Sequence, residues 1–473
     1  MREEDEPTDV GSDGLSSFME EIAEPLLCNA RLLLGILLIA FAIRMTYAVV
    51  DQVPLRVDAR LYHGVALNLM NGFGFVESPG VPAHQDPVIR LSSPLYPMFL
   101  SGIYAIFGVR LWVVWLIQAL MGALTCIALF MAGRQAFGDQ VGLLAAFVAA
   151  VNFDLIIYPA MLLTETLYLF LVSLGLVVLF LAISARSPRI YFLAGIVLGL
   201  ATFTRPNLAF FLVLFCLWKA RYEMVRAVIP LMLGVALILM PWAIRNYQIY
   251  HEFFLLPANG GIAFWLGNNP EADGSYPNQV PAFIREKSIR PAYMREQNRQ
   301  GYAEGYRFIR EHPVRYVRLL GLKLTKFLSP LRTNGWWFHM QGVERVVSIL
   351  LSGLTTAFLL AFGLLGMFLA AKRRPNAQIT CGLLYALSVL SSAFIYMTHA
   401  RYRLPIFPVL IIFAAYGAVE VWRNQAFPET DGDRRMVRRA LIGAMGIVLA
   451  AVTIDGLTTA SEILRRVSRL FGT

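Results

Sequence analysis

Two acidic residues stand where acids are unusual, beside long apolar runs. Asp58 follows the first run by a few residues, and Glu165 opens a later apolar stretch. A carboxylate at the mouth of a cavity in the membrane could take the proton from an incoming hydroxyl group. Both acids also suit the first turn of a helix, where the helix dipole favours negative charge. A catalytic role and a helix-capping role therefore both remain open for these two residues.

Arginines, histidines and side-chain amides gather near the ends of other apolar runs. Arg401 and Arg403 precede one run, and Arg205 stands before Pro206 between two short runs. Arginine suits phosphate because its planar fork of donors can bind two oxygens at once. Contact with ordinary lipid headgroups and anchoring at the interface are the alternatives. The candidate substrate-binding residues are Arg60, Tyr62, His84, Arg90, Tyr96, Arg205, Arg245, Asn246, Asn268, Asn269, His399, Arg401, Tyr402 and Arg403.

The composition indicates what kind of chain must position these residues. Of 473 residues, 57% are hydrophobic and only 15% are charged, against about 25% charged in a typical soluble domain. Apolar runs recur along the whole chain, and they are too continuous for the alternating strands of a membrane barrel. The composition excludes an ordinary soluble enzyme and a disordered chain. It predicts an all-α polytopic membrane protein.

The cysteines and short motifs give no sign of a metal or nucleotide site. Four cysteines are present, three of them inside apolar runs and none closely paired. They are typical of small buried side chains and not of a disulfide framework. Walker A and H-E-x-x-H patterns are absent from the sequence. The formal net charge is +10. We ascribe it to basic residues that collect at cytoplasmic loop ends and near anionic lipid, and we expect no nucleic-acid partner.

The apolar runs predict about eleven transmembrane helices. The run at 94–108 is short for a span and is expected to lie at the interface or to re-enter. The basic clusters favour a cytoplasmic N-terminus, which leaves two large periplasmic loops with juxtamembrane helices. An arrangement in which the N-terminus is outside and 94–108 crosses the membrane places the basic clusters in the cytoplasm equally well. The predicted spans are 32–50, 111–133, 141–159, 164–183, 191–204, 207–218, 227–244, 346–371, 377–397, 404–422 and 440–457.

Four regions follow from this division. An acidic cytoplasmic tail over 1–30 precedes an N-terminal transmembrane catalytic module over 31–244, which includes the periplasmic loop 51–110. A periplasmic loop subdomain covers 245–344, and its segment 302–328 has the periodicity of a helix lying along the membrane surface. C-terminal transmembrane helices occupy 345–473.

The order of the motifs resembles that of bacterial integral-membrane glycosyltransferases of family 39, within the GT-C superfamily. These are similar to protein O-mannosyltransferases and to the aminoarabinose transferase that modifies lipid A. The resemblance covers roughly residues 30–425. It rests on Asp58 with Tyr62, Pro94-Leu95-Tyr96-Pro97, Phe107-Gly108, Leu163-Thr164-Glu165, Gly199-Leu200-Ala201, Thr204-Arg205-Pro206, Arg245-Asn246 and Arg401-Tyr402-Arg403-Leu404-Pro405.

The resemblance implies a GT-C-like fold and transfer of a sugar from a polyprenyl-phosphate donor by direct displacement. It makes Asp58 the base on the acceptor hydroxyl and Glu165 a second acid, with Arg401 and Arg403 holding the departing phosphate. The acceptor would be an envelope lipid, a glycan or a protein, at the periplasmic face of a bacterial inner membrane. Ala59 replaces the glutamate that many relatives carry after the aspartate. That difference leaves the acceptor class and the need for a divalent metal open.

A transporter or flippase of a polyprenyl-linked glycan is the alternative function. Transport requires polar residues through the depth of the membrane. Here the ionisable residues gather at the outer ends of the predicted spans, and Arg44 is the main exception within a span. This distribution favours chemistry on one side of the membrane. A third hypothesis, a scaffolding membrane protein, would need neither Asp58 nor Glu165.

Overall fold

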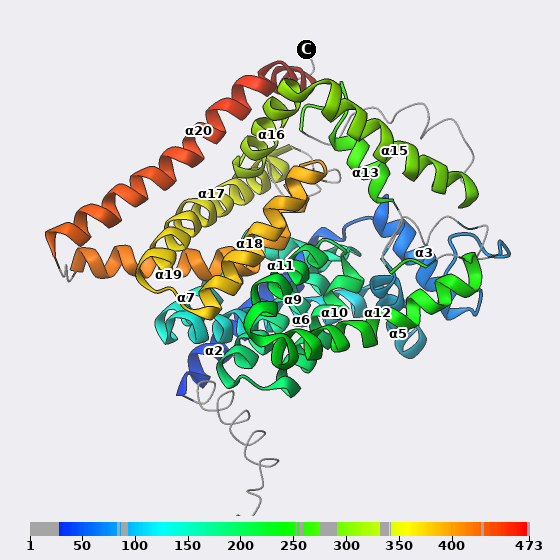
Figure 1. Cartoon of the computed structure of the whole chain (residues 1–473), viewed down its shortest axis with the longest axis horizontal. Helices are drawn as coiled ribbons and strands as arrows, with labels where there is room; N and C mark the ends of the chain where they lie inside the picture. Colours follow the sequence, from blue (N-terminus) through cyan, green and yellow to red (C-terminus); the bar gives the residue numbers. More distant parts are fainter. Residues whose placement is uncertain are drawn as a thin grey trace, which may run out of the picture.

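The computed structural model describes residues 28–82, 86, 93–251, 253–255, 259–274, 291–331, 340, 342–398, 400–426 and 430–470. Throughout these residues the regular structure is helical, without strands, and the predicted all-α polytopic membrane fold is confirmed. Figure 1 shows the helices of the N-terminal half packed as one body, with α17–α20 beside them.

The helices of the N-terminal half are α2 (Ala30–Asp51), α3 (Asp58–Met70), α5 (Leu95–Phe107), α6 (Leu111–Phe137), α7 (Asp139–Val151), α8 (Phe153–Ile157), the 3-10 turn η1 (Tyr158–Ala160), α9 (Glu165–Ala185), α10 (Pro188–Thr204), α11 (Leu208–Glu223), the π-helical turn η2 (Met224–Val228) and α12 (Ile229–Tyr250). The remaining elements are α13 (Gly260–Gly267), α15 (Pro291–Glu311), α16 (Pro313–Leu328), α17 (Gly342–Arg373), α18 (Ala377–Ile395), the 3-10 turn η3 (Ala400–Ile406), α19 (Phe407–Ala426) and α20 (Asp431–Leu470).

The number of spans differs from the eleven predicted. Among the described residues, eight helices are long and apolar enough to cross a membrane, or nine if the bent pair of α7 with α8–η1 forms one span. The difference arises at α10, which has only 17 residues, and at α11 and α12, which continue through η2 as one stretch of 43 residues. Such a stretch is about twice as long as one crossing needs. The apolar runs therefore lie where they were predicted but are divided differently.

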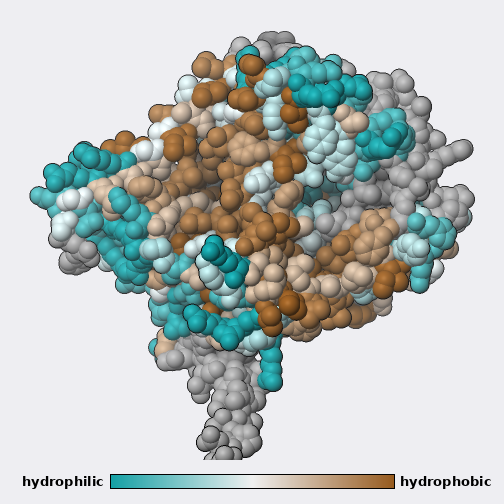
Figure 2. All heavy atoms as spheres, in the orientation of Figure 1, coloured by the Kyte–Doolittle hydropathy of each residue, from teal (hydrophilic) through white to brown (hydrophobic). Residues whose placement is uncertain are grey.

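The helices α9 and α19 form the centre of the protein. In the most apolar 18-residue stretch of α9, and in that of α19 taken with η3, 89% of the residues are buried; the corresponding share is 22% in α2 and in α20. The exposed apolar side chains of α2 and α20 suit contact with lipid. Figure 2 shows the matching surface, with hydrophobic residues across the middle of the view and hydrophilic residues gathered toward the left end and the top.

The predicted span 141–159 is broken. Its two parts, α7 and α8–η1, meet at an angle of 60°. Asn152 caps the second part, because its side chain accepts a hydrogen bond from the backbone amide of Leu155 at 3.2 Å. Arg44 from α2 donates to the last carbonyls of the first part, those of Ala149 at 2.9 Å and Ala150 at 3.2 Å. A guanidinium and a capping amide thus satisfy the backbone that the break frees.

The helices α10 and α12 approach each other through glycine. A side chain on Gly195 would overlap the backbone carbonyl of Leu231, and one on Gly234 would overlap that of Phe192. Small residues allow such close contact between helices in a membrane, where dispersion forces drive association. This packing fixes the end of α10, which leads directly into Arg205.

Replacing Gly195 by alanine is expected to lower stability by about 1–3 kcal/mol, the usual range for overpacking a tight contact. The two helices would have to separate to admit the new Cβ atom. Thermal unfolding in detergent provides the measurement. Gly446→Ala in α20 is the matched control, because nothing lies within 4 Å of its added Cβ. Equal melting temperatures for the two variants would contradict the prediction.

Basic residues meet acids and amides at the helix ends opposite η3. Arg373 at the end of α17 binds Glu420 of α19 at 2.7 Å and Asp433 of α20 at 2.9 Å. Arg423, near the end of α19, donates to Gln140 of α7 at 2.7 Å. Because η3 precedes α19, these basic residues and Arg401 lie at opposite ends of that helix.

Candidate active site

Four charged side chains from four separate segments meet in one cluster, which we call the charged cluster. Asp58 begins α3, Glu165 begins α9, Arg205 follows α10 and Arg401 lies in η3. The two acids occupy first turns, where the helix dipole favours them. Arg205 is extended, with φ −145° and ψ 121°, because the following Pro206 disfavours a helical conformation. Each charge therefore stands at or beside the end of a helix.

Arg401 connects the two acids of the charged cluster. It donates from Nη1 to Oδ2 of Asp58 at 2.7 Å, from Nη2 to Oε2 of Glu165 at 3.3 Å and from Nε to Oε1 of Glu165. Arg205 donates from Nη2 to Oε1 of Glu165 at 2.7 Å and from Nε to the Thr164 hydroxyl at 3.0 Å. Glu165 thus lies between two guanidinium groups.

The members of the charged cluster differ in exposure. The side chain of Glu165 is 1% exposed and that of Arg401 is 6% exposed, whereas Asp58 retains 36%. Two carboxylates and two guanidinium groups balance in charge, which makes their burial tolerable. Asp58 is the acid through which the cluster reaches the surface. A substrate arriving from outside would meet Asp58 before Glu165.

A chain of polar contacts leads from α3 toward the start of α9. The ring of Tyr62 meets that of Tyr96 edge-on, with centroids 5.3 Å apart. Tyr96 donates its hydroxyl hydrogen to the Gln118 side chain at 2.8 Å. Gln118 then donates to the carbonyls of Pro159 at 2.8 Å and Met161 at 3.0 Å. These contacts hold the segment that presents Glu165.

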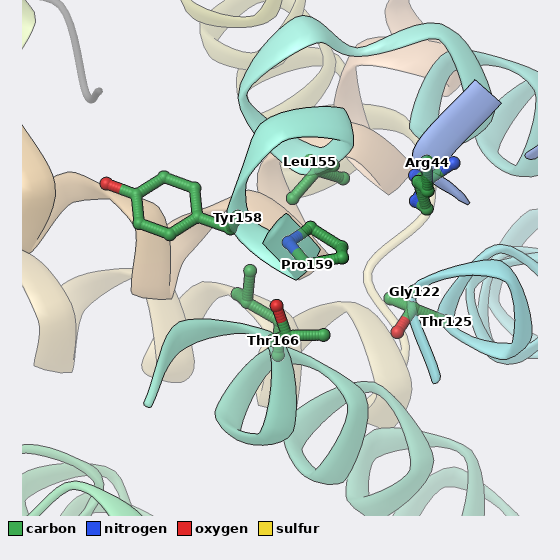
Figure 3. A pocket seen from close by; sticks show the side chains of 8 residues that line it. Arg44, Gly122, Thr125, Leu155, Tyr158, Pro159 and Thr166 are labelled. Atoms are coloured by element: carbon green, nitrogen blue, oxygen red, sulfur yellow. The ribbon is translucent and has the colours of Figure 1, made fainter. Parts of the chain in front are cut away.

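A small cavity lies behind that segment. Figure 3 shows Arg44, Pro159 and Thr166 around it, with Gly122 at one side. Its volume of about 10 Å³ is near the minimum needed for one water molecule. The cavity is therefore too small for a sugar.

Arg245 lies at the end of α12 with its guanidinium 4.5 Å from the centre of the Trp242 ring. It is partly buried, and Nη1 donates to the Asn246 side chain at 3.4 Å. Trp242 packs edge-on against Phe203, with centroids 5.7 Å apart, near the end of α10. Arg245 is thereby placed on the same side of the bundle as Arg205.

The predicted amides bind backbone groups. Asn246 donates to the carbonyl of Phe254 at 3.0 Å. Asn268 donates to the carbonyls of Phe264 and Ile395, and Asn269 donates to that of Trp265. These contacts stabilise the loop around α13.

The remaining predicted residues are dispersed. Arg403 is 1% exposed, and its Nη1 donates to the carbonyls of Phe327 and Ser329, each at 2.9 Å. Arg60 and Tyr402 are exposed. His84, Arg90 and His399 lie outside the described residues.

Three polar residues with clear contacts were not among the predicted site residues. Thr164 binds Arg205, Gln118 binds Tyr96, and Lys323 of α16 is almost fully buried. Gln118 offered a signal, because it is a lone amide inside the apolar run 111–133. Lys323 offered no such signal, since a lysine in this part of the sequence is equally typical of the exposed face of a helix.

The described part of the chain contains no group of three or more histidine, cysteine, aspartate or glutamate residues that could hold a metal ion. The charged cluster holds two acids, and each is bound by arginine.

Part of the chain matches a known family. Residues 91–244 match the family described as dolichyl-phosphate-mannose-protein mannosyltransferase. This segment resembles the protein mannosyltransferases. The match includes Glu165 and Arg205, whereas Asp58 and Arg401 lie outside it. The resemblance predicted from the motifs is thereby confirmed. No sequence among curated proteins matches the chain significantly.

Several solved structures are similar over most of this chain, two of which follow. The oligosaccharyltransferase of Archaeoglobus fulgidus in its apo form has 15% identity and a TM-score of 0.48, with 89% of this chain and 56% of that chain covered. ArnT from Cupriavidus metallidurans, bound to undecaprenyl phosphate, has 13% identity and a TM-score of 0.48, with 92% and 72% covered. This chain spans little more than half the length of the archaeal protein.

Proposed function

We propose that this protein is a membrane glycosyltransferase that moves a sugar from a polyprenyl-phosphate donor to the hydroxyl group of an acceptor. The observation that carries the proposal is the charged cluster, in which Asp58 stays accessible while Arg401 binds it. The family matched by residues 91–244 is named for a sugar carried on a lipid phosphate, which supports the same donor class. The site is assigned to the periplasmic face of a bacterial inner membrane, because the basic helix ends lie opposite to it.

The proposed reaction is a direct displacement at the anomeric carbon. The acceptor oxygen forms a bond to that carbon while the bond from the carbon to the phosphate oxygen breaks. The hydroxyl proton passes to the carboxylate of Asp58, and the polyprenyl phosphate leaves with the bonding electron pair. Glu165 is a poorer base because it is buried between Arg205 and Arg401. Its role is to hold Arg401 where that residue can orient Asp58.

The donor phosphate is assigned to Arg245 in place of Arg401 and Arg403. Arg401 is bound to two carboxylates, and Arg403 is only 1% exposed and is bound to two backbone carbonyls. Arg245 is partly buried and contacts the Trp242 ring, the Asn246 amide and the Tyr250 side chain, and none of these groups is a carboxylate that would neutralise its charge. A cation held on an aromatic face is well placed to bind phosphate.

Replacing Arg245 by glutamine is expected to raise the KM for the donor about 10- to 100-fold, because one charge-assisted phosphate contact contributes about 1.5–3 kcal/mol. The value of kcat should change much less. Steady-state kinetics with varied donor concentration provide the measurement. Arg299→Gln in α15 is the control, since that arginine is exposed and pairs with Glu296 of the same helix. An unchanged KM would remove Arg245 from the donor site.

The function itself is tested with purified protein in liposomes that contain a mixed set of polyprenyl-phosphate sugars, with an envelope extract as acceptor. Protein-dependent release of free polyprenyl phosphate would establish the transferase and identify the sugar. Movement of the lipid between leaflets, with no release from any donor, would establish the flippase instead.

A further inference from the structure

The helix α16 contacts the chain on both sides of Arg401, which lies in the turn η3. Before the turn, Lys323 donates from Nζ to the carbonyl of Phe394 at 2.9 Å. After Arg401, Arg403 donates from Nη1 to the carbonyls of Phe327 and Ser329 at the end of α16. A single helix, α16, therefore contacts the chain both before and after Arg401.

Lys323 occupies an unusual position for a lysine. It is 1% exposed, and its second hydrogen bond goes to the Asn268 side chain at 3.0 Å. Burial lowers the pKa of Lys323 to about 7, because the charged ammonium group loses its contact with water. A methionine would pack there without this penalty. The two hydrogen bonds are what distinguish lysine from such a side chain.

The residues between α18 and η3 are held from several directions. Asn268 donates to the carbonyl of Ile395 at 2.8 Å, beside the bond from Lys323. The backbone amide of Thr398 donates to the carbonyl of Gly274 at 3.0 Å. Gly267 lies so close to the carbonyl of Tyr396 that an added Cβ atom would overlap it. The backbone is thus fixed from the end of α18 to within a few residues of Arg401.

We propose that Lys323 and Arg403 are positioning residues that form a clamp, through which α16 places Arg401 between Asp58 and Glu165. The clamp acts on the end of α18 through Lys323 and on η3 through Arg403. Its kinetic consequence rests on the proposed function, whereas its structural consequence does not.

Loss of the clamp should affect catalysis more than donor binding. Arg401 bonds to both acids at short range, and small misplacements of catalytic groups can lower rates about 100-fold. Arg245, assigned to the donor phosphate, lies on α12 and is not part of the clamp. The clamp therefore predicts a fall in kcat with little change in the KM for the donor.

The test compares Lys323→Met with Lys326→Met. Methionine keeps a long, unbranched apolar side chain but removes the donors. Lys326 is a matched control because it is also buried in α16 yet pairs with Asp273. Hydrogen exchange at the backbone amides of 400–406, followed by mass spectrometry, reports the clamp without reference to activity. Lys323→Met is expected to speed this exchange and to lower kcat about 10-fold, and Lys326→Met to leave both near wild type.

Lys323→Arg restores donors and is expected to recover part of both losses. If Lys323→Met does not yield folded protein, Asn268→Ala removes the neighbouring bond to Ile395 and should speed the same exchange. Unchanged exchange at 400–406 in Lys323→Met, or equal changes in Lys326→Met, would overturn the clamp. If the wild-type protein releases no polyprenyl phosphate, the proposed function is refuted. The exchange measurement still tests the clamp in that case, because it does not depend on activity.

Discussion

Replacement of Asp58 by asparagine is expected to lower kcat about 10²- to 10⁴-fold, the usual contribution of a general base. Asparagine has nearly the same shape, and its side-chain oxygen can still accept a hydrogen bond from Arg401. It cannot take up the proton that the acceptor hydroxyl loses. Donor affinity should stay close to that of the wild type, because the phosphate is assigned to Arg245.

The measurement is single-turnover release of polyprenyl phosphate, with donor binding determined separately on the same preparations. Glu304→Gln is the control, since it removes an exposed acid from α15, outside the charged cluster. Turnover within a factor of about three of wild type would exclude Asp58 as the base. Loss of donor binding together with turnover would instead make Asp58 part of the donor site.

Replacement of Glu165 by glutamine should produce the largest loss of stability, about 3–5 kcal/mol, which is typical when one partner of a buried ion pair is removed. Two guanidinium groups would then share the cluster with Asp58 alone, and Asp58 is the more exposed acid. Activity should fall as well, because glutamine keeps only one of the two oxygens with which Glu165 accepts hydrogen bonds from Arg401.

A double-mutant cycle isolates the ionic contribution from the change of side chain. Arg205→Met removes one of the two cations facing Glu165, so adding it to Glu165→Gln should recover part of the lost stability. Unfolding in mixed micelles of increasing denaturing detergent provides the free energies. If the two losses are simply additive, the charge balance of the cluster does not explain its stability.

The positions of the four cluster residues could be predicted from the sequence, but their partners could not. Charges are costly in hydrocarbon, so Asp58, Glu165, Arg205 and Arg401 had to stand at the ends of apolar runs. Positive charge elsewhere indicated that these ends share one side. Which arginine meets which acid depends on helix packing, such as the glycine contact that sets the end of α10.

The partners of Arg401 and Arg403 also could not be predicted from the sequence. The sequence suggested that both hold phosphate, because they stand two residues apart before an apolar run. They lie in a 3-10 turn, where a spacing of two residues is a rotation of about 240° and leaves the two side chains about 120° apart. One therefore binds the acids and the other binds α16. The break at Asn152 was equally unpredictable, because the group that satisfies its carbonyls comes from α2.

Arg44 has a consequence for how the protein enters its membrane. An arginine near the centre of a helix raises the free energy of insertion by about 2.5–3.5 kcal/mol. The carbonyls of Ala149 and Ala150 that accept its hydrogen bonds follow 105 and 106 residues later in the chain. At ordinary rates of translation, about 5–20 residues per second, that separation is a delay of about 5–20 s. Through this interval α2 is expected to keep Arg44 in contact with water or with the insertion machinery. It should settle at its final depth only when α7 has arrived beside it.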